Sequence, residues 1–112
     1  MTVIAESELA PSSIGREFIG EDHGGAGISL LLIDAPPGRG PRLHRHAYEE
    51  VFVVQEGEAT FRLGEEERTV TAGHVVVVPA GRPHGFVNSG DRPLRQVAIH
   101  VSPRMVTEWL ED

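Results

Sequence analysis

The histidines at positions 44 and 46 constrain the fold of this chain more than any other feature, because they stand two residues apart. Side chains at this spacing point to the same face of an extended strand, roughly 6.6 Å apart. In a helix the same side chains would lie about 200° apart around the axis. Two imidazoles can therefore turn toward one ion, about 2 Å from each nitrogen, only if His44 and His46 lie on a strand.

Glu50 follows four residues after His46 and can join this site only if the chain bends between them. A straight strand would carry Glu50 roughly 13 Å away from His46. The run at 51–54, Val-Phe-Val-Val, is β-branched and aromatic and soon reaches Gly57, which indicates a second strand that starts at Glu50. The sequence thus predicts two facing strands, one with the imidazoles and the other with the carboxylate.

Composition narrows the classes of function. A chain of 112 residues with a formal charge of −7 is large enough for one domain. Its excess of acidic residues argues against nucleic-acid and anionic-membrane partners, because both need clustered basic side chains. The chain has no cysteine, so a metal would have to be held by histidine and carboxylate groups. We expect a cytoplasmic protein, since neither a signal peptide nor a membrane-spanning run is visible.

Short apolar runs separated by Gly and Pro predict an antiparallel sandwich or barrel. Residues 1–16 form an N-terminal arm that we expect to pack on a partner subunit. Pro79-Ala80-Gly81 predicts a β-turn with Pro at the second position, and Ser102-Pro103 predicts the start of a short helix over 104–110. Further strands are expected at 16–19, 28–33, 59–63, 68–71, 75–78, 84–88 and 94–101.

Two of these runs, 28–33 and 75–78, are apolar on both faces. A strand of this kind needs a cover on its outer face as well as on its inner face. We therefore expect a homodimer in which a second copy covers the outer face of one sheet.

The spacing of ten residues resembles the two sequence motifs of the cupin family. The first motif covers residues 38–57, and its fixed positions are filled by Gly38, His44, His46, Glu50 and Gly57. The second covers residues 73–88, and its fixed positions are filled by Gly73, Pro79, Gly81, His84 and Asn88. One departure is His74, where many cupins have Asp.

This resemblance implies a single cupin domain over residues 1–112, all-β, with the double-stranded β-helix or jelly-roll fold. It also implies one divalent metal ion per chain, bound by His44, His46, Glu50 and His84. Three imidazoles and one carboxylate suit Fe, Mn, Ni, Cu or Zn, and they leave two positions of an octahedron open.

Other side chains are candidates for contact with a small-molecule substrate. Gln96 and His100 share the strand face opposite Val97 and Ile99, and they are candidates for acid–base or substrate contacts. Arg42 shares the face of His44 and His46, where it could pair with a substrate carboxylate or, as a rim residue, with a surface Glu. Three aromatic residues could form the core, contact a ligand, or do both: Phe52, Phe61 and Phe86.

The resemblance leaves the reaction open, because similar small cupins include dioxygenases, isomerases, decarboxylases and cyclases. We favour a metal-dependent enzyme with dioxygenase-type chemistry at iron. The alternative is a non-catalytic module that binds a metal or a metabolite.

Overall fold

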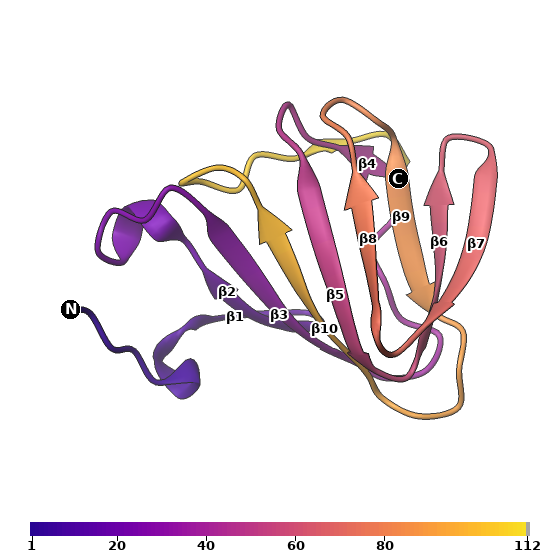
Figure 1. Cartoon of the computed structure of the whole chain (residues 1–112), viewed down its shortest axis with the longest axis horizontal. Coiled ribbons are helices and arrows are strands. Elements are labelled where there is room, and N and C mark those ends of the chain that lie inside the picture. The colour runs from indigo at the N-terminus through magenta and orange to yellow at the C-terminus, as the bar shows by residue number, and fades with distance from the viewer. Residues whose placement is uncertain (112) are drawn as a thin grey trace.

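The chain folds into two antiparallel sheets that face each other across the core (Figure 1). The computed structural model describes residues 1–111. The six-stranded sheet has the order β1 (Ala10–Ser12), β2 (Gly15–Phe18), β3 (Ser29–Ala35), β10 (Leu94–His100), β5 (Glu50–Glu56) and β8 (His74–Val78). The five-stranded sheet has the order β11 (Glu108–Trp109), β4 (His44–Arg45), β9 (His84–Asn88), β6 (Glu58–Leu63) and β7 (Glu66–Thr71).

From β4 to β10 the chain crosses repeatedly between the two sheets, so that strands adjacent in a sheet are mostly not adjacent in sequence. This connectivity is the jelly roll, and it confirms the predicted fold class. The helical content is limited to two short 3-10 turns, η1 (Glu6–Glu8) and η2 (Gly20–Asp22), in the described residues. No helix within residues 1–111 has the length and apolar character needed to cross a membrane.

The core lies where strands of the two sheets turn alternate residues inward. In β5, Phe52 and Val54 are buried, while Val51 and Val53, which alternate with them, face outward. The ring of Phe52 packs edge-to-face against Phe61, at 5.0 Å between centroids, and against Phe86, at 5.6 Å. These three rings bridge the two sheets, and the ring of Phe52 lies 6.3 Å from that of His84.

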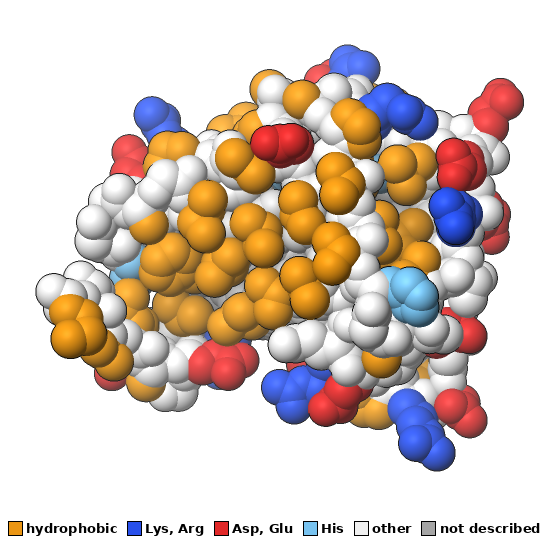
Figure 2. Space-filling view, in the orientation of Figure 1, with side chains coloured by type: hydrophobic (Ala, Val, Ile, Leu, Met, Phe, Trp, Pro, Cys, Tyr) orange, Lys and Arg blue, Asp and Glu red, His pale blue; other side chains and the backbone are white. Residues whose placement is uncertain are grey.

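The outer face of the six-stranded sheet is apolar over four adjacent strands (Figure 2). Strand register places eight aliphatic side chains in two rows across β3, β10, β5 and β8. Val75 and Val77, on the edge strand β8, are 61% and 57% exposed. We name these residues the aliphatic face: Leu30, Ile99, Val51 and Val77 in one row, and Leu32, Val97, Val53 and Val75 in the other.

The turn after β8 lies one residue later than predicted. Its hydrogen bond runs from the Arg82 N–H to the Pro79 carbonyl, 3.2 Å, so Pro79 is the first residue of the turn and not the second. Gly81 occupies the third position with φ +78°, which a residue with a side chain rarely adopts. The N–H of Gly81 also donates to the carbonyl of His46, 2.8 Å away, and so connects the two motifs.

The predicted C-terminal helix is wrong. The chain bends at Pro103 and Arg104 and then continues without a helix to β11, which pairs with β4. A helix of seven residues is too short to be stable by itself, whereas the extended segment gains partners from the five-stranded sheet. The Leu110 N–H donates to the Leu43 carbonyl at 3.0 Å, and Glu108 forms a two-contact ion pair with Arg45.

The N-terminal arm is more closely integrated than we expected. Strands β1 and β2 extend the edge of the six-stranded sheet beyond β3. Leu9 and Ile14 are buried against their own chain, so they are not free to pack on a second subunit.

Candidate metal centre

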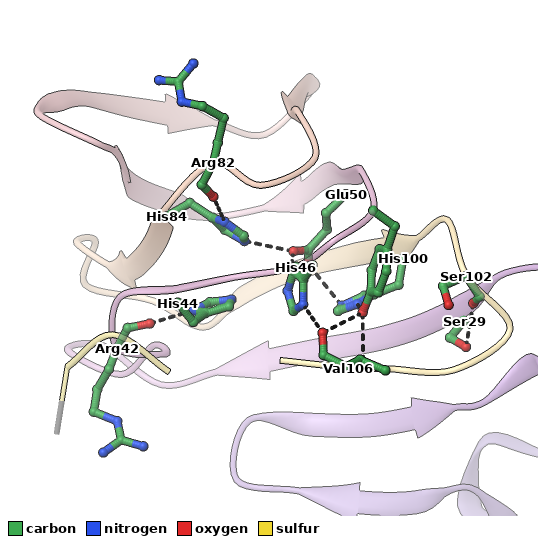
Figure 3. A network of polar contacts seen from close by, with 11 residues as sticks. Ser29, Arg42, His44, His46, Glu50, Arg82, His84, His100, Ser102 and Val106 are labelled. Atoms are coloured by element: carbon green, nitrogen blue, oxygen red, sulfur yellow. Dashed lines mark hydrogen bonds and ion pairs between the residues drawn. The ribbon is translucent and has the colours of Figure 1, made fainter. Parts of the chain in front are cut away.

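Histidines from the five-stranded sheet meet a carboxylate from the opposite sheet at one end of the barrel (Figure 3). His44 begins β4 and pairs in register with His84, the first residue of β9. His46 follows β4, and Glu50 begins β5 after the predicted bend. All four side chains are buried, and one potential ligand atom from each lies within 4.8 Å of the others.

Backbone carbonyls fix the orientation of the three imidazoles. The Nδ1 atoms of His44, His46 and His84 lie 2.6, 2.8 and 2.9 Å from the carbonyl oxygens of Arg42, Val106 and Arg82, respectively. A carbonyl accepts only, so Nδ1 carries the proton and the Nε2 lone pair of a neutral ring points into the cluster. The guanidinium groups of Arg42 and Arg82 point away from it (Figure 3).

The Nε2 atoms of His84 and His46 converge on one oxygen of Glu50. Oε1 lies 2.9 Å from His84 Nε2 and 3.2 Å from His46 Nε2. The contact with His46 lacks hydrogen-bond geometry, so that His46 Nε2 is a buried nitrogen without a hydrogen-bond partner in the described residues. Lone pairs that face a carboxylate repel it unless a proton or a cation lies between them. This arrangement fits a divalent ion with three nitrogen ligands and one oxygen ligand.

Electrostatics of the cluster favour neutral His44 and ionised Glu50. Burial lowers the pKa of His44 to about 4, with help from the neighbouring His84 and His46. Burial alone would raise the pKa of Glu50, but contacts with His100, His46 and His84 hold it well below its usual range. Burial likewise opposes the charged form of His46, yet Glu50 and the Val106 carbonyl raise the pKa of His46 above its ordinary value. Deprotonated Glu50 and neutral His44 are the forms that bind metals.

His100 is a fourth histidine at the cluster. Its Nε2 lies 3.1 Å from Glu50 Oε2, and its Nδ1 lies 2.7 Å from the hydroxyl of Tyr48. That hydroxyl also accepts a hydrogen bond from the Val106 N–H at 3.1 Å. The strand-face argument therefore placed His100 correctly on the inner side of β10. Nothing in the sequence indicated that Tyr48, which lies in the bend between His46 and Glu50, contacts His100.

The other candidate residues are dispersed. Gln96 is buried on the same face as His100 but four residues away, and it does not line the cavity beside the cluster. Phe52 and Phe86 line that cavity, while Phe61 lies deeper in the core. Arg42 is exposed, and its guanidinium lies 4.9 Å from the ring centroid of Trp109, outside the cavity. Contact of these residues with a substrate stays a prediction.

The cavity adjoins the cluster and has a volume of about 390 Å³. Its lining includes Glu17 from β2 and three residues of the C-terminal segment, Met105, Thr107 and Trp109. None of the four was expected to line a site. Met105, Thr107 and Trp109 alternate with the period of a strand, but the start signal at Ser102-Pro103 led us to predict a helix there.

Two curated relatives illustrate how the chain compares with known proteins. It is 29% identical to auxin-binding protein 4 of Zea mays over 99 residues, which cover 80% of this chain and 48% of that protein. It is 30% identical to an uncharacterised protein of Methanocaldococcus jannaschii over 93 residues, which cover 81% and 74% of the two chains. The chain thus spans about half the length of the auxin-binding protein.

Solved structures share the fold over nearly the whole chain. A double-stranded β-helix protein of unknown function from Klebsiella pneumoniae has a TM-score of 0.77 at 20% identity, covering 98% of this chain and 97% of that one. Oxalate oxidase in complex with glycolate has a TM-score of 0.80 at 21% identity, covering 96% and 63%. Oxalate decarboxylase of Bacillus subtilis, which has Mn(II) centres, has a TM-score of 0.77 at 25% identity, covering 92% and 30%.

The family profile described as "Cupin domain" matches residues 31–100, a segment that contains both histidine strands, Glu50 and His100. Because this match covers more than half of the chain, the protein belongs to the cupin family.

Proposed function

We propose that this cupin is a small-molecule metalloenzyme of the dioxygenase type, with one divalent ion bound by His44, His46, Glu50 and His84. The observation that carries the proposal is the arrangement of the three imidazoles. Each is buried with its Nδ1 against a carbonyl, and together with Glu50 they place four potential ligand atoms within 4.8 Å of one another beside a cavity. Nothing in the packing of the core requires three buried histidines at one point.

The protein groups have distinct tasks in this proposal. The three carbonyl contacts keep the histidine rings in one orientation and one tautomer. Glu50 supplies the negative charge that a divalent ion needs in a buried place, and Phe52 and Phe86 keep water from the inner wall of the cavity. A bound divalent metal polarises an oxygen atom of the substrate or exchanges an electron with it.

Manganese and iron are the first ions to test. The donor set suits both, as well as nickel, copper and zinc. Manganese is supported by the Mn(II) centres of the B. subtilis decarboxylase, which shares the fold. Iron is supported by the reaction type that we favour.

The test begins with the metal content of the freshly purified protein, prepared with and without air. We expect one ion per chain, and we expect a chelator to lower the melting temperature, because an ion that binds only the folded form stabilises it. His46→Ala should remove this response to the chelator, whereas His74→Ala, at an exposed site, should keep it. An unchanged response in His46→Ala would contradict the ligand assignment.

Catalysis is tested separately, by O2 consumption of the metal-loaded protein with phenols and 1,3-diketones. Consumption that depends on His46 supports the dioxygenase type. The main alternative is a non-catalytic binding module, which the name of the auxin-binding relative favours. A metal-dependent decarboxylase, isomerase or cyclase is a further alternative, and the oxalate decarboxylase among the structural neighbours favours the first of these. Binding of ligand without turnover across metals and substrates would favour the module.

The proposed assembly is a homodimer. The aliphatic face is wide and uncharged, and a second copy of the same face would cover it by twofold symmetry. The aliphatic face is on the opposite side of the sheet from the residues that line the cavity, such as Leu31, Glu50 and Phe52. The cytoplasmic location stays a prediction from the sequence.

A further inference from the structure

The cavity beside the histidine cluster has a wall that is mainly apolar. Aliphatic and aromatic side chains come from the N-terminal strands, from both sheets and from the C-terminal segment. They include Ile14, Leu31, Phe52, Phe86, Met105 and Trp109. A molecule as small as oxalate would leave most of the roughly 390 Å³ unfilled and most of this wall without a contact.

No arginine side chain lines this space within residues 1–111. All ten basic residues are arginines, and none of them lines the cavity. Arg16 precedes Glu17 on β2 and so faces the other side of the strand, where its guanidinium donates to the Leu9 carbonyl at 3.0 Å. Arg42 lies over Trp109 from outside, and Arg82 points away from the histidines (Figure 3).

Two carboxylates already face the cavity, Glu50 at the cluster and Glu17 on β2. A divalent ion at the cluster would balance these two charges and no more. A dicarboxylate would then bring two further negative charges into a space whose formal charge the ion and the two carboxylates already balance. Burial of unpaired charge is unfavourable, whereas burial of an aromatic ring against this wall is favourable.

We propose that the cavity takes a predominantly apolar, aromatic molecule with at most one negative charge, oriented with an oxygen atom toward the histidine cluster, and that it discriminates against small dicarboxylates. This inference rests on the proposed function, because a metal ion supplies the positive charge that the oxygen atom faces. It separates this chain from the oxalate enzymes that share its fold.

The C-terminal segment makes the inference measurable. Met105, Thr107 and Trp109 face the cavity, and the segment is held by the contact between the Val106 carbonyl and His46 and by the backbone hydrogen bond from Leu110 to Leu43. Trp109 is the only tryptophan of the chain. Its fluorescence therefore reports on the cavity without interference from another tryptophan.

The experiment titrates the full-length, Mn(II)-loaded protein with phenylacetate, acetate and oxalate. Trp109 fluorescence and calorimetry measure binding, and elemental analysis of the same samples measures retained metal. We expect phenylacetate to bind at least roughly tenfold more tightly than either acetate or oxalate, and to change the Trp109 emission. Acetate is the matched control for the ring, because it carries the same carboxylate without it.

Two variants test the apolar wall of the cavity and the negative charge of Glu17. Met105→Gln keeps the length of the side chain but makes it polar, and it should weaken phenylacetate binding while leaving acetate binding unchanged. Glu17→Gln should tighten oxalate binding by roughly threefold, about the effect of one partly exposed charge. Glu65→Gln removes a negative charge from the exposed β6–β7 turn, and it should change neither phenylacetate binding nor oxalate binding.

The outcomes distinguish the two proposals. Metal-loaded protein that binds oxalate as tightly as phenylacetate, or binds neither, would overturn the substrate class and leave the metal site standing. Protein that retains no Mn(II) or other divalent ion would overturn the proposed function, and this inference with it.

Discussion

His100 contacts the oxygen of Glu50 that the other histidines leave free. His100 Nε2 lies 3.1 Å from Glu50 Oε2, whereas Oε1 faces His84 and His46 at 2.9 and 3.2 Å. The hydroxyl of Tyr48, 2.7 Å from His100 Nδ1, fixes the ring of His100 from the other side. His100 is therefore placed to hold the carboxylate so that its other oxygen is directed toward His84 and His46.

Removal of His100 should weaken metal binding without removing a ligand. We expect His100→Ala to raise the dissociation constant for Mn(II) by about 10- to 100-fold, the usual effect of losing a residue that orients a ligand. Tyr48→Phe should act in the same direction and less strongly. The measurement is a competition titration with a chromophoric chelator, and His74→Ala is the control. Unchanged affinity in His100→Ala would show that Glu50 is oriented without it.

The titration of His44 should differ from that of His46 in the metal-free protein. We expect His44 to titrate with a midpoint near pH 4, because burial and its histidine neighbours disfavour the charged ring. The pKa of His46 should lie above its ordinary value, because the contacts with Glu50 and with the Val106 carbonyl together outweigh its burial. Resonances of the two rings in NMR spectra recorded across pH give both midpoints. A midpoint of His44 at or above 6.5 would contradict this expectation.

These shifts determine the sign of the pH dependence of stability. The pKa of folded His44 lies below its unfolded value, so between pH 6.5 and about 4 the unfolded chain binds more protons. The contribution of His44 to the free energy of unfolding is complete above pH 6.5 and is lost as the pH falls toward 4. His46 has the opposite sign, since its pKa is raised on folding: its contribution is complete below pH 6.5 and is lost as the pH rises through the folded value.

Asn88 should contribute to the free energy of unfolding and not to metal binding. Its buried side-chain amide donates to the carbonyls of Ala35 and Arg92, at 2.9 and 2.8 Å, and its oxygen accepts from the Gly90 N–H at 2.9 Å. We expect Asn88→Ala to lower the free energy of unfolding by about 2–4 kcal/mol, because it leaves buried backbone groups unpaired. Urea unfolding measures this loss, with the exposed Gln55→Ala as the control. A change below about 0.5 kcal/mol would refute this role.

The aliphatic face should control the oligomeric state. We expect the wild-type protein to sediment as a dimer at micromolar concentration and Val77→Arg to sediment as a monomer. Val77 is 57% exposed in one chain. The dimer would bury the introduced arginine against an apolar face that offers no opposite charge. Thr69→Arg, on exposed β7 of the other sheet, should remain a dimer. A wild-type monomer would refute the dimer.

Much of the site could be predicted from the sequence, because it depends on local periodicity. The spacing of His44 and His46 requires a strand, and the bend before Glu50 follows from the distance that a straight strand would cover. Alternation along 94–100 also placed His100 on the inner face of β10, where the structure has it. The wrong helix at 104–110 came from local helix-start residues in a segment too short to be stabilised by them.

The sequence by itself determined the class of fold, the donor residues brought to one end of a barrel and the apolar character of the outer sheet face. These follow from side-chain alternation and from turn residues, which act over a few positions. Only the tertiary structure decided that the Val106 carbonyl holds the ring of His46, that Tyr48 contacts His100, and that the C-terminal segment forms a wall of the cavity. Such contacts join residues more than 50 positions apart, and their energies depend on how the two sheets pack, which no local pattern encodes.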